Sequence, residues 1–540
     1  MSIKSTMMNF PLALPHMLER IGLFYPDVEV VSRMPDKSLH RTNYGQIHKR
    51  AKQLASALSR HGIKKGECVA TLMWNHYAHI EAYMGIPVMG GVIHTLNLRL
   101  SPEDIAYIAT HADDKILIID DILLPLYEQF KDKVPFKEVI VVPLTGESVA
   151  DEFINYEDFL ASGDSNFCYP DINENDPAGM CYTSGTTGRP KGVVYSHRST
   201  VLHCFAETMT DTLAISQHDV VMPVVPMFHA NAWGLPYTSV MVGAKQVLPG
   251  PHLDAESLLN LYESEQVTLS AGVPTIWMAI KQAREAEPDR WKTAANMRMA
   301  VGGSAVPESL FRAFDAFDMK IIQAWGMTET SPLATLGGIQ SSLMNLDEDE
   351  KYKYRIKQGV PLPFVEVRIV DDEGNIQPWD GVSQGDAQLR GPWITGSYHK
   401  SEGSDDKFSK EGWLKTGDVC NIDQYGYVKL TDRTKDLVKS GGEWISSVDL
   451  ENAIMGHPDV IEAAVIAVPH PKWDERPLAA IVVKPGKTVT TADIRQFLDG
   501  KFAKIWLPDA VETIDEIPKT STGKFMKLKL REMYKDWSWD

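Results

Sequence analysis

A run of small, polar and basic residues has the composition of a phosphate-binding loop. It reads Tyr182-Thr183-Ser184-Gly185-Thr186-Thr187-Gly188-Arg189-Pro190-Lys191-Gly192. Glycines let several backbone N–H groups point at one anion, hydroxyl groups donate to its oxygens, and cations offset its charge. An ordinary turn can share this composition, but the attached Pro190-Lys191-Gly192 favours phosphate binding. The P-loop of kinases needs glycine directly before its lysine and a hydroxyl residue directly after, and Pro190 and Gly192 hold those places.

Two bulky rings follow in the apolar segment 226–234. His229 and Trp233 lie four residues apart there, among apolar neighbours. A lone histidine beside a phenylalanine is more often a core residue than part of a site. The spacing nevertheless allows both rings to wall one pocket.

A third group combines glycines, a tryptophan and hard oxygen atoms. Gly302-Gly303-Ser304-Ala305 follows an apolar stretch, and Gln323-Ala324-Trp325-Gly326-Met327-Thr328-Glu329-Thr330 comes next. Glycines let backbone approach a flat base, and Trp325 offers a ring for stacking. Thr328 and Glu329 supply oxygens that suit phosphate and Mg²⁺. Either segment alone could be a structural turn.

The remaining candidates lie toward the end of the chain. Asp418 and Arg433 stand in turn-rich segments, where a charged residue is usually just solvated. Lys524 closes the segment Ile517-Pro518-Lys519-Thr520-Ser521-Thr522-Gly523-Lys524, which leads into a basic tail with Lys527, Lys529, Arg531 and Lys535. By composition alone, the cations of this tail are expected to be solvated.

Together these motifs resemble the adenylate-forming superfamily of acyl-CoA synthetases, luciferases and peptide-synthetase adenylation domains. Five motifs occur in the family's order, and the resemblance runs from about residue 20 to 535. Gly441-Gly442-Glu443-Trp444 and Trp473-Asp474-Glu475-Arg476-Pro477 are similar to the fatty-acyl-CoA synthetase branch and its close relative, methylmercaptopropionate-CoA ligase. The resemblance implies an AMP-forming acyl-CoA synthetase that uses ATP, Mg²⁺ and CoA. A carboxylate would first give acyl-AMP and pyrophosphate, and CoA would then displace AMP.

The resemblance also implies a role for each candidate residue. The catalytic residues would be Lys524, His229 and Glu329, with Lys524 bridging the carboxylate and the α-phosphate. ATP and AMP would be bound by Thr183, Ser184, Gly185, Thr186, Thr187, Gly188, Lys191, Gly302, Gly303, Ser304, Ala305, Gln323, Ala324, Trp325, Gly326, Met327, Thr328, Asp418 and Arg433. The metal would be held by Glu329 and Thr183, and the acyl pocket would be lined by His229, Trp233, Gly303 and Met327. CoA would contact Ser440, Gly441, Gly442 and Glu443, and Lys435 would be the hinge.

Hydrophobic patterns predict how these residues are positioned. Ile47, Ala51, Leu54, Ala55 and Leu58 mark one helix face that stops before Gly62. Residues 69–73, 116–119 and 139–142 are apolar runs typical of strands, and the last two are β-branched runs of the kind buried on both faces of a parallel sheet. Shorter strands with glycine turns begin near residue 340 and predict a β-rich subdomain. Beyond residue 432 we expect a helix from Val448, strands at 460–468 and 479–483, and a helix over 491–502.

We therefore predict an α/β fold with two domains, because 540 residues exceed one hydrophobic core. Residues 1–431 would form a large N-terminal AMP-binding domain with layered sheets and a β-rich subdomain. Residues 432–436 would be a hinge, and 437–540 a small mobile α+β domain. Hinge closure would bring Lys524 to the site for the first step and another face for the second.

Composition limits the class of partner. A formal charge of −18 argues against nucleic-acid binding, and no apolar run is long enough to span a membrane. The five cysteines are scattered and lack metal-ligand spacing, which predicts a reduced, cytoplasmic protein without structural zinc. The expected partners are a small carboxylic acid, ATP and CoA, and a homodimer is compatible with the fatty-acyl resemblance.

The acid and the acceptor are the open points. The apolar segment 271–274 adds to the acyl pocket, and 3-methylmercaptopropionate or a short- or medium-chain fatty acid fits the pattern. A long-chain fatty-acyl-CoA synthetase is the alternative, as is an enzyme that loads a carrier protein in place of CoA. A non-catalytic nucleotide sensor would bind ATP without releasing pyrophosphate, and the presence of Lys524 and Glu329 argues against it.

Overall fold

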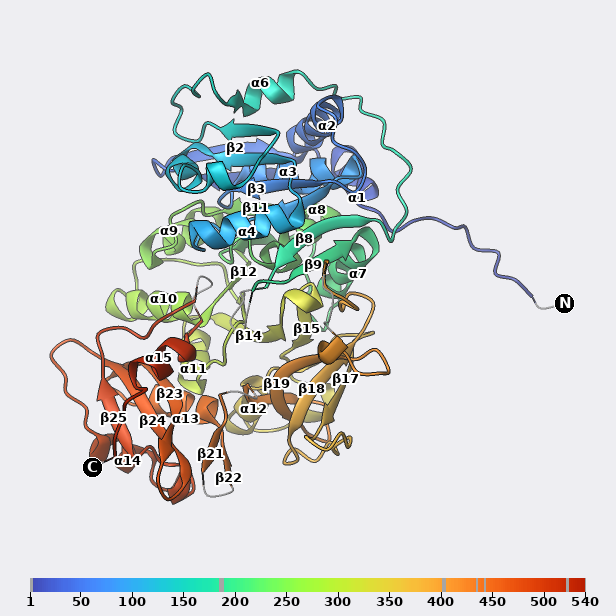
Figure 1. Ribbon diagram of the computed structural model, residues 1–540. Coiled ribbons are helices and arrows are strands. Elements are labelled where there is room, and N and C mark those ends of the chain that lie inside the picture. Colours follow the sequence, from blue (N-terminus) through green and yellow to red (C-terminus); the bar gives the residue numbers. More distant parts are fainter. Residues whose placement is uncertain are drawn as a thin grey trace.

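Two large sheets build the first part of the chain, and two smaller sheets follow (Figure 1). The computed structural model describes residues 3–183, 189–400, 405–433, 436–440, 443–520 and 524–539. Within these ranges, none of the helices combines the length and the apolar character that crossing a bilayer requires.

The first large sheet has seven strands in the order β7-β6-β5-β3-β4-β8-β9. All neighbours are parallel except the antiparallel pair β8 and β9. Every residue of β3 and β5 is buried, as expected for apolar strands covered on both faces. The strands are β3 (Cys68–Leu72), β4 (Val92–Thr95), β5 (Ile116–Asp120), β6 (Glu138–Val142), β7 (Ile154–Asn155), β8 (Pro177–Tyr182) and β9 (Gly192–Ser196).

The second large sheet has nine strands in the order β16-β15-β14-β13-β12-β10-β11-β1-β2. Its six central strands, from β14 to β1, run parallel, so their carboxyl ends share one edge. The strands are β1 (Glu29–Arg33), β2 (Leu39–Asn43), β10 (Val220–Pro223), β11 (Lys245–Leu248), β12 (Leu269–Gly272), β13 (Met297–Val301), β14 (Met319–Gly326), β15 (Leu333–Leu336) and β16 (Val360–Pro361).

Helix α3 joins the two large sheets. It contacts β3, β4 and β8 of one sheet and β1 of the other, and its residues from Ala78 to Val88 are all buried. One hydrophobic core therefore extends through both sheets. The helices of this part are α1 (Leu14–Phe24), α2 (Tyr44–Arg60), α3 (Tyr77–Val88), α4 (Pro102–Ala112), α5 (Leu124–Tyr127), α6 (Tyr156–Ala161), α7 (His197–Thr208), α8 (Leu235–Val242), α9 (Ala255–Glu265), α10 (Pro274–Ala286), α11 (Glu308–Ala316) and α12 (Glu348–Arg355).

A four-stranded antiparallel sheet comes next, drawn in orange in Figure 1. It consists of β17 (Glu366–Val370), β18 (Gly385–Arg390), β19 (Leu414–Ile422) and β20 (Val428–Arg433). The C-terminal part, in red, builds a five-stranded sheet with its own apolar core. Its elements are β21 (Val438–Ser440), β22 (Glu443–Ile445), α13 (Ser447–Ile454), β23 (Val460–His470), β24 (Asp474–Val483), α14 (Thr491–Leu498), β25 (Ala510–Thr513) and α15 (Lys527–Met533).

The predicted α/β class, with layered sheets, a β-rich subdomain and an α+β C-terminal part, is confirmed. The helix expected over 491–502 is shorter than predicted and ends at Leu498. Asp499 is extended there, with φ −61° and ψ 134°, and Gly500 has a φ of 77°. The apolar pattern continues beyond the helix because Phe502 still packs on the core of the C-terminal part.

Candidate active site

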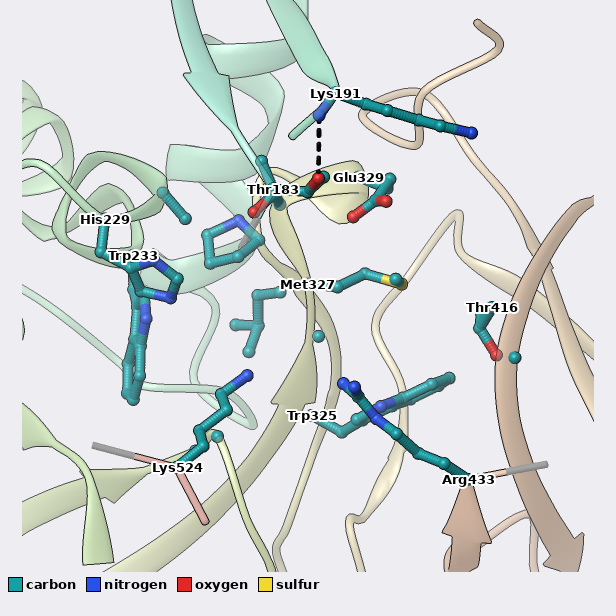
Figure 2. A pocket seen from close by; sticks show the side chains of 18 of the residues that line it. Thr183, Lys191, His229, Trp233, Trp325, Met327, Glu329, Thr416, Arg433 and Lys524 are labelled. Atoms are coloured by element: carbon teal, nitrogen blue, oxygen red, sulfur yellow. Dashed lines mark hydrogen bonds between the residues drawn. The ribbon is translucent and has the colours of Figure 1, made fainter. Parts of the chain in front are cut away.

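A cavity of about 550 Å³ lies where segments of both large sheets, the four-stranded sheet and the C-terminal part meet. The parallel strands β12, β13 and β14 end at it, which is where open α/β sheets place their ligands. Thr183 and Lys191 at the ends of the loop between β8 and β9, strand β19 and the C-terminal part complete its wall (Figure 2). The cavity is lined by Thr183, Arg189, Lys191, His229, Ala230, Trp233, Val273, Gly302, Gly303, Ala324, Trp325, Gly326, Met327, Thr328, Glu329, Pro332, Leu333, Tyr398, Asp406, Lys407, Lys415, Thr416, Gly417, Arg433 and Lys524.

Hydrogen bonds pin both ends of the predicted phosphate loop. The backbone N–H of Thr183 donates to the carbonyl of Lys191 at 2.9 Å, and the N–H of Lys191 donates to Thr183 Oγ1 at 3.1 Å (Figure 2). The Lys191 ammonium lies 5.0 Å from the ring centre of Tyr398. Five of the seven residues between Thr183 and Lys191, Ser184 to Gly188, fall outside the described residues.

Glu329 presents a buried carboxylate to the cavity. The Tyr398 hydroxyl donates to its Oε1 at 2.7 Å. Burial raises the pKa of Glu329, and the neighbouring Asp418 carboxylate adds to that shift, while the Tyr398 hydrogen bond opposes it. A carboxylate in such surroundings favours a cation as its partner.

Trp325, Asp418 and Arg433 form a connected group. The indole Nε1 of Trp325 donates to Asp418 Oδ2 at 3.0 Å, and Arg433 Nε lies 3.4 Å from Asp418 Oδ1. Trp325 and Arg433 line the cavity, whereas Asp418 does not. Each oxygen of Asp418 thus holds one side chain, and each keeps a further lone pair for another donor.

His229 and Trp233 lie on the opposite side of the cavity (Figure 2). Burial, together with the Lys524 and Arg99 cations, lowers the pKa of His229 to about 3, so its ring is neutral at pH 7. The Trp233 ring covers Gly302: a Cβ atom on Gly302 would lie 3.1 Å from Trp233 Cη2.

The chain from Ala230 to Trp233 has left-handed backbone at four successive residues. Their φ angles are 42°, 54°, 49° and 59°, and Gly234 follows at 84°. Left-handed backbone costs a non-glycine residue about 1–2 kcal/mol. This turn carries Trp233 into the cavity wall.

Lys524 reaches the cavity from the C-terminal part (Figure 2). Two hydrogen bonds hold its backbone: Thr520 N–H donates to the Lys524 carbonyl at 2.7 Å, and Lys524 N–H donates to Thr520 Oγ1 at 3.1 Å. Burial lowers the pKa of Lys524 to about 8, and Arg433 contributes in the same direction, while Asp418 and Glu329 oppose the shift.

The structure therefore brings fourteen predicted residues to one cavity: Thr183, Lys191, His229, Trp233, Gly302, Gly303, Ala324, Trp325, Gly326, Met327, Thr328, Glu329, Arg433 and Lys524. Among the described residues, the predicted Ser304, Ala305, Gln323, Asp418 and Ser440 do not line it. Ser440 is buried, and its Oγ accepts from Arg476 Nη1 at 2.9 Å. Lys435, Gly441, Gly442 and the side chain of Glu443 lie outside the described part of the chain.

Some residues of the site carried no sequence signal. Tyr398 belongs to no motif, yet it contacts both Glu329 and Lys191. The expectation of a solvated basic tail is wrong for Lys527, which lies 2.7 Å from Glu451 Oε1 and is only 11% exposed. Arg531 likewise pairs with Asp436 at 2.6 Å. Their carboxylate partners stand 76 and 95 positions earlier in the chain, so no local pattern reveals these pairs.

Comparison with known proteins agrees with this arrangement. A family model described as "AMP-binding enzyme" matches residues 19–399, and one described as "AMP-binding enzyme C-terminal domain" matches residues 449–524. A long-chain-fatty-acid–CoA ligase of Thermus thermophilus is 48% identical over 99% of this chain and 97% of its own length. A 3-methylmercaptopropionyl-CoA ligase of Ruegeria lacuscaerulensis is 43% identical over 98% of both chains.

A solved structure of an anthranilate CoA ligase in complex with anthranoyl-AMP has the same overall arrangement. It superimposes with a TM-score of 0.87 at 26% identity, covering 98% of both chains. Matches of this extent, at more than 40% identity for the two bacterial ligases, leave one conclusion. The chain belongs to the family of AMP-binding, adenylate-forming enzymes, in its fatty-acyl-CoA synthetase branch.

Proposed function

We propose that this chain is an AMP-forming acid–CoA ligase, which activates a carboxylic acid with ATP and transfers the acyl group to CoA. The observation that carries the proposal is the position of Lys524. A lysine near the C-terminus lies in the same cavity as Arg433, Glu329, Thr183 and Lys191. Ligases of this chemistry are similar to the chain over nearly its whole length.

In the first step a carboxylate oxygen attacks the α-phosphorus of ATP. The new P–O bond forms as the bond to the bridging oxygen of the β-phosphate breaks, giving acyl-AMP and pyrophosphate. Both reactants are anions, and a protonated Lys524 between them reduces their repulsion and stabilises the charge that develops. We propose that neutral His229 would lie beside the acid without adding a charge, and that the Trp325 ring would stack on the adenine.

Two oxygen-bearing side chains of the cavity suit a divalent cation. The Glu329 carboxylate and the Thr183 hydroxyl both line it, and Mg²⁺ prefers one or two such oxygens together with substrate phosphates. We propose that these two residues hold Mg²⁺ when ATP is bound. The ion would offset phosphate charge there.

In the second step the CoA thiol attacks the acyl carbon, the thioester bond forms, and AMP leaves. We propose that residues 437–540 act as a small domain that turns about Lys435 between the two steps. The segment Ser440 to Glu443 would then supply CoA contacts. In the arrangement described here, Ser440 is buried and accepts a hydrogen bond from Arg476 of the same C-terminal part.

For the acid, we propose 3-methylmercaptopropionate or a short- or medium-chain fatty acid. The wall formed by Trp233 over Gly302 limits the apolar end of the cavity, together with Val273 and Leu333. The ligase from Ruegeria lacuscaerulensis named for 3-methylmercaptopropionyl-CoA supports the same choice. A long-chain acid is the second candidate, favoured by the name of the relative from Thermus thermophilus, and it requires Trp233 to move aside.

Pyrophosphate release measured over acids from propionate to palmitate, with 3-methylmercaptopropionate included, tests the proposal. We expect acid-dependent release and an acyl-CoA product when free CoA is present. ATP binding without release with any acid would contradict the enzyme and favour a nucleotide sensor. Release without acyl-CoA would favour an enzyme that loads a carrier protein.

We further propose that the enzyme works in the cytoplasm and as a homodimer. Its five cysteines are free thiols, and four of them are buried, which suits a reducing compartment. Light scattering of the purified chain tests the dimer.

A further inference from the structure

Lys527 begins helix α15, three residues after Lys524, and its ammonium is enclosed by acceptors. Its Nζ lies 2.7 Å from Glu451 Oε1 and donates to Ser447 Oγ at 2.5 Å. Burial alone would lower the pKa of Lys527, but the carboxylates of Glu451, Asp432 and Asp436 outweigh it and raise that pKa. The cation is therefore bound in place and is not solvated.

Ser447 links Lys527 to the strand that precedes the proposed hinge. The Ser447 hydroxyl donates to Asp432 Oδ2 at 2.5 Å, and its backbone N–H donates to the same oxygen at 2.9 Å. Asp432 belongs to β20, whereas Ser447 begins α13 in the C-terminal part. The hydrogen-bond chain from Lys527 to Asp432 thus spans residue 435.

Two more contacts run beside this chain. Lys429 Nζ on β20 lies 2.8 Å from Asp449 Oδ2 on α13, and the Ser446 hydroxyl donates to the carbonyl of Thr431. Asp432 itself is 4% exposed. Strand β20 and helix α13 therefore meet through polar groups, which a rotation about residue 435 would separate without breaking an apolar core.

The link continues from Lys527 to the cavity through a short, well-bonded segment. Met526 N–H donates to the Pro518 carbonyl at 2.7 Å, and Thr520 N–H donates to the Lys524 carbonyl at 2.7 Å. Since only two residues separate Lys524 from Lys527, a displacement of the start of α15 moves Lys524 as well.

We propose that Lys527 is a positioning residue for the adenylation step. By holding on to Asp432 through Ser447, it fixes α15 against β20 and keeps the Lys524 ammonium in the cavity. When the C-terminal part turns for the second step, the contact to Asp432 is released, while the pair with Glu451 moves as one unit. This inference rests on the proposed function.

The first experiment separates the two half-reactions in the variant Lys527→Met. We expect adenylation to fall by about 10- to 100-fold, the scale of a 1 Å misplacement of a catalytic group. Thioester formation from supplied acyl-AMP should stay within about twofold, which also shows that the variant is folded. Lys529→Met, an exposed lysine on the same helix, is the matched control and should leave both half-reactions unchanged.

The variant Asp432→Asn tests the same link from the other side without removing the Lys527–Glu451 pair. It should lower adenylation selectively as well. The double variant Lys527→Met/Asp432→Asn should then lose little more than Lys527→Met, because both changes break one connection. Additive losses, or equal losses in both half-reactions, would overturn the proposal and leave Lys527 a merely structural residue.

A measurement that needs no turnover completes the test. The rate at which an amine-reactive reagent labels Lys524, followed by mass spectrometry, should rise severalfold in Lys527→Met and stay at the wild-type value in Lys529→Met. An unchanged labelling rate in Lys527→Met would overturn the proposal for Lys527. Failure of the wild-type enzyme to release pyrophosphate with any acid would instead contradict the proposed function. The labelling rate can be measured in either case.

Discussion

The side chain of Lys524 packs directly over Gly303. A Cβ atom on Gly303 would lie 3.1 Å from Lys524 Cε, and the φ of Gly303 is 94°, a value that favours glycine. Two residues more than 200 positions apart are therefore in contact at the cavity. The C-terminal part therefore stands with Lys524 in the cavity, the arrangement that we propose for the first half-reaction.

Lys524→Ala should lower the rate of adenylation by about 10²- to 10³-fold or more, because one preorganised charge partner of the transition state is lost. Thioester formation from supplied acyl-AMP should be far less affected. Pyrophosphate release and acyl-CoA formation, measured separately, check this split. Lys519→Ala is the control, since Lys519 lies in the same segment but pairs with Glu462 at 2.8 Å. Equal losses in both half-reactions would contradict the assignment.

The pH dependence of adenylation should show a falling limb near pH 8. Lys524 acts as a cation, its pKa is lowered to about 8 by burial and by Arg433, and a rise in pH through that value removes its charge. This decrease should appear in kcat/KM, because the pH dependence of kcat/KM reports the pKa values of groups in the free enzyme. Lys524→Arg, whose side chain stays charged, should lower the rate but flatten that limb. A falling limb that persists in Lys524→Arg would assign it to another group.

Glu329→Gln should raise the Mg²⁺ concentration needed for half-maximal adenylation and lower the maximal rate. The amide keeps the size of the side chain and can still accept from Tyr398, but it lacks the charge that a hard cation prefers. Titration of activity with Mg²⁺ at saturating ATP measures the shift. Tyr398→Phe is the comparison, because it leaves the carboxylate and removes only the 2.7 Å hydrogen bond. An unchanged Mg²⁺ requirement in Glu329→Gln would remove Glu329 from the metal site.

Gly302→Ala should reduce kcat/KM most for the longer or bulkier acids. The added methyl group would lie 3.1 Å from Trp233 Cη2 and 3.4 Å from the Ala324 carbonyl oxygen, so the ring must shift into the acyl space. Loss or gain of one methyl-sized volume in such a pocket changes kcat/KM about 10- to 200-fold. Gly338→Ala, where the added atom meets nothing within 4 Å, should leave the acid preference unchanged. Trp233→Ala should extend the range toward longer acids.

Glu207→Gln should stabilise the protein more at pH 8 than at pH 5. Burial raises the pKa of Glu207 to about 8, so between pH 4.5 and 8 the folded state keeps a proton that the unfolded state has lost. Stability of the wild type therefore falls as pH rises through that window, and the neutral amide does not share the loss. Thermal unfolding of both proteins at several pH values checks this. A difference in melting temperature that does not change with pH would show that Glu207 titrates normally.

Much of the fold could be predicted because it rests on local patterns. The β-branched runs at 116–119 and 139–142 became β5 and β6, and the apolar face from Ile47 to Leu58 became one side of α2. Hydrophobic periodicity depends only on which face of a helix or strand is buried. It can therefore be recognised in the sequence without knowing which element covers that face.

The site was predictable only where side chains belong to motifs. Gly302, Glu329 and Lys524 converge because their segments end strands or leave tight turns at one cavity. Tyr398 and Lys527 were missed because their roles come from partners distant in sequence, Glu329 and Glu451. A long-range polar pair of this kind has no period and no spacing that a single sequence displays.

The left-handed run from Ala230 to Trp233 has a further consequence for how this wall could be altered. Its two alanines hold a conformation that glycine adopts freely, so neighbouring contacts must compensate about 1–2 kcal/mol at each. Replacing Ala232 by glycine would relax the backbone and at the same time let the tryptophan ring sample more orientations. The backbone strain and the selectivity between acids would then decrease together. A substitution in this short loop could therefore widen the range of acids without changing any residue proposed to bind ATP.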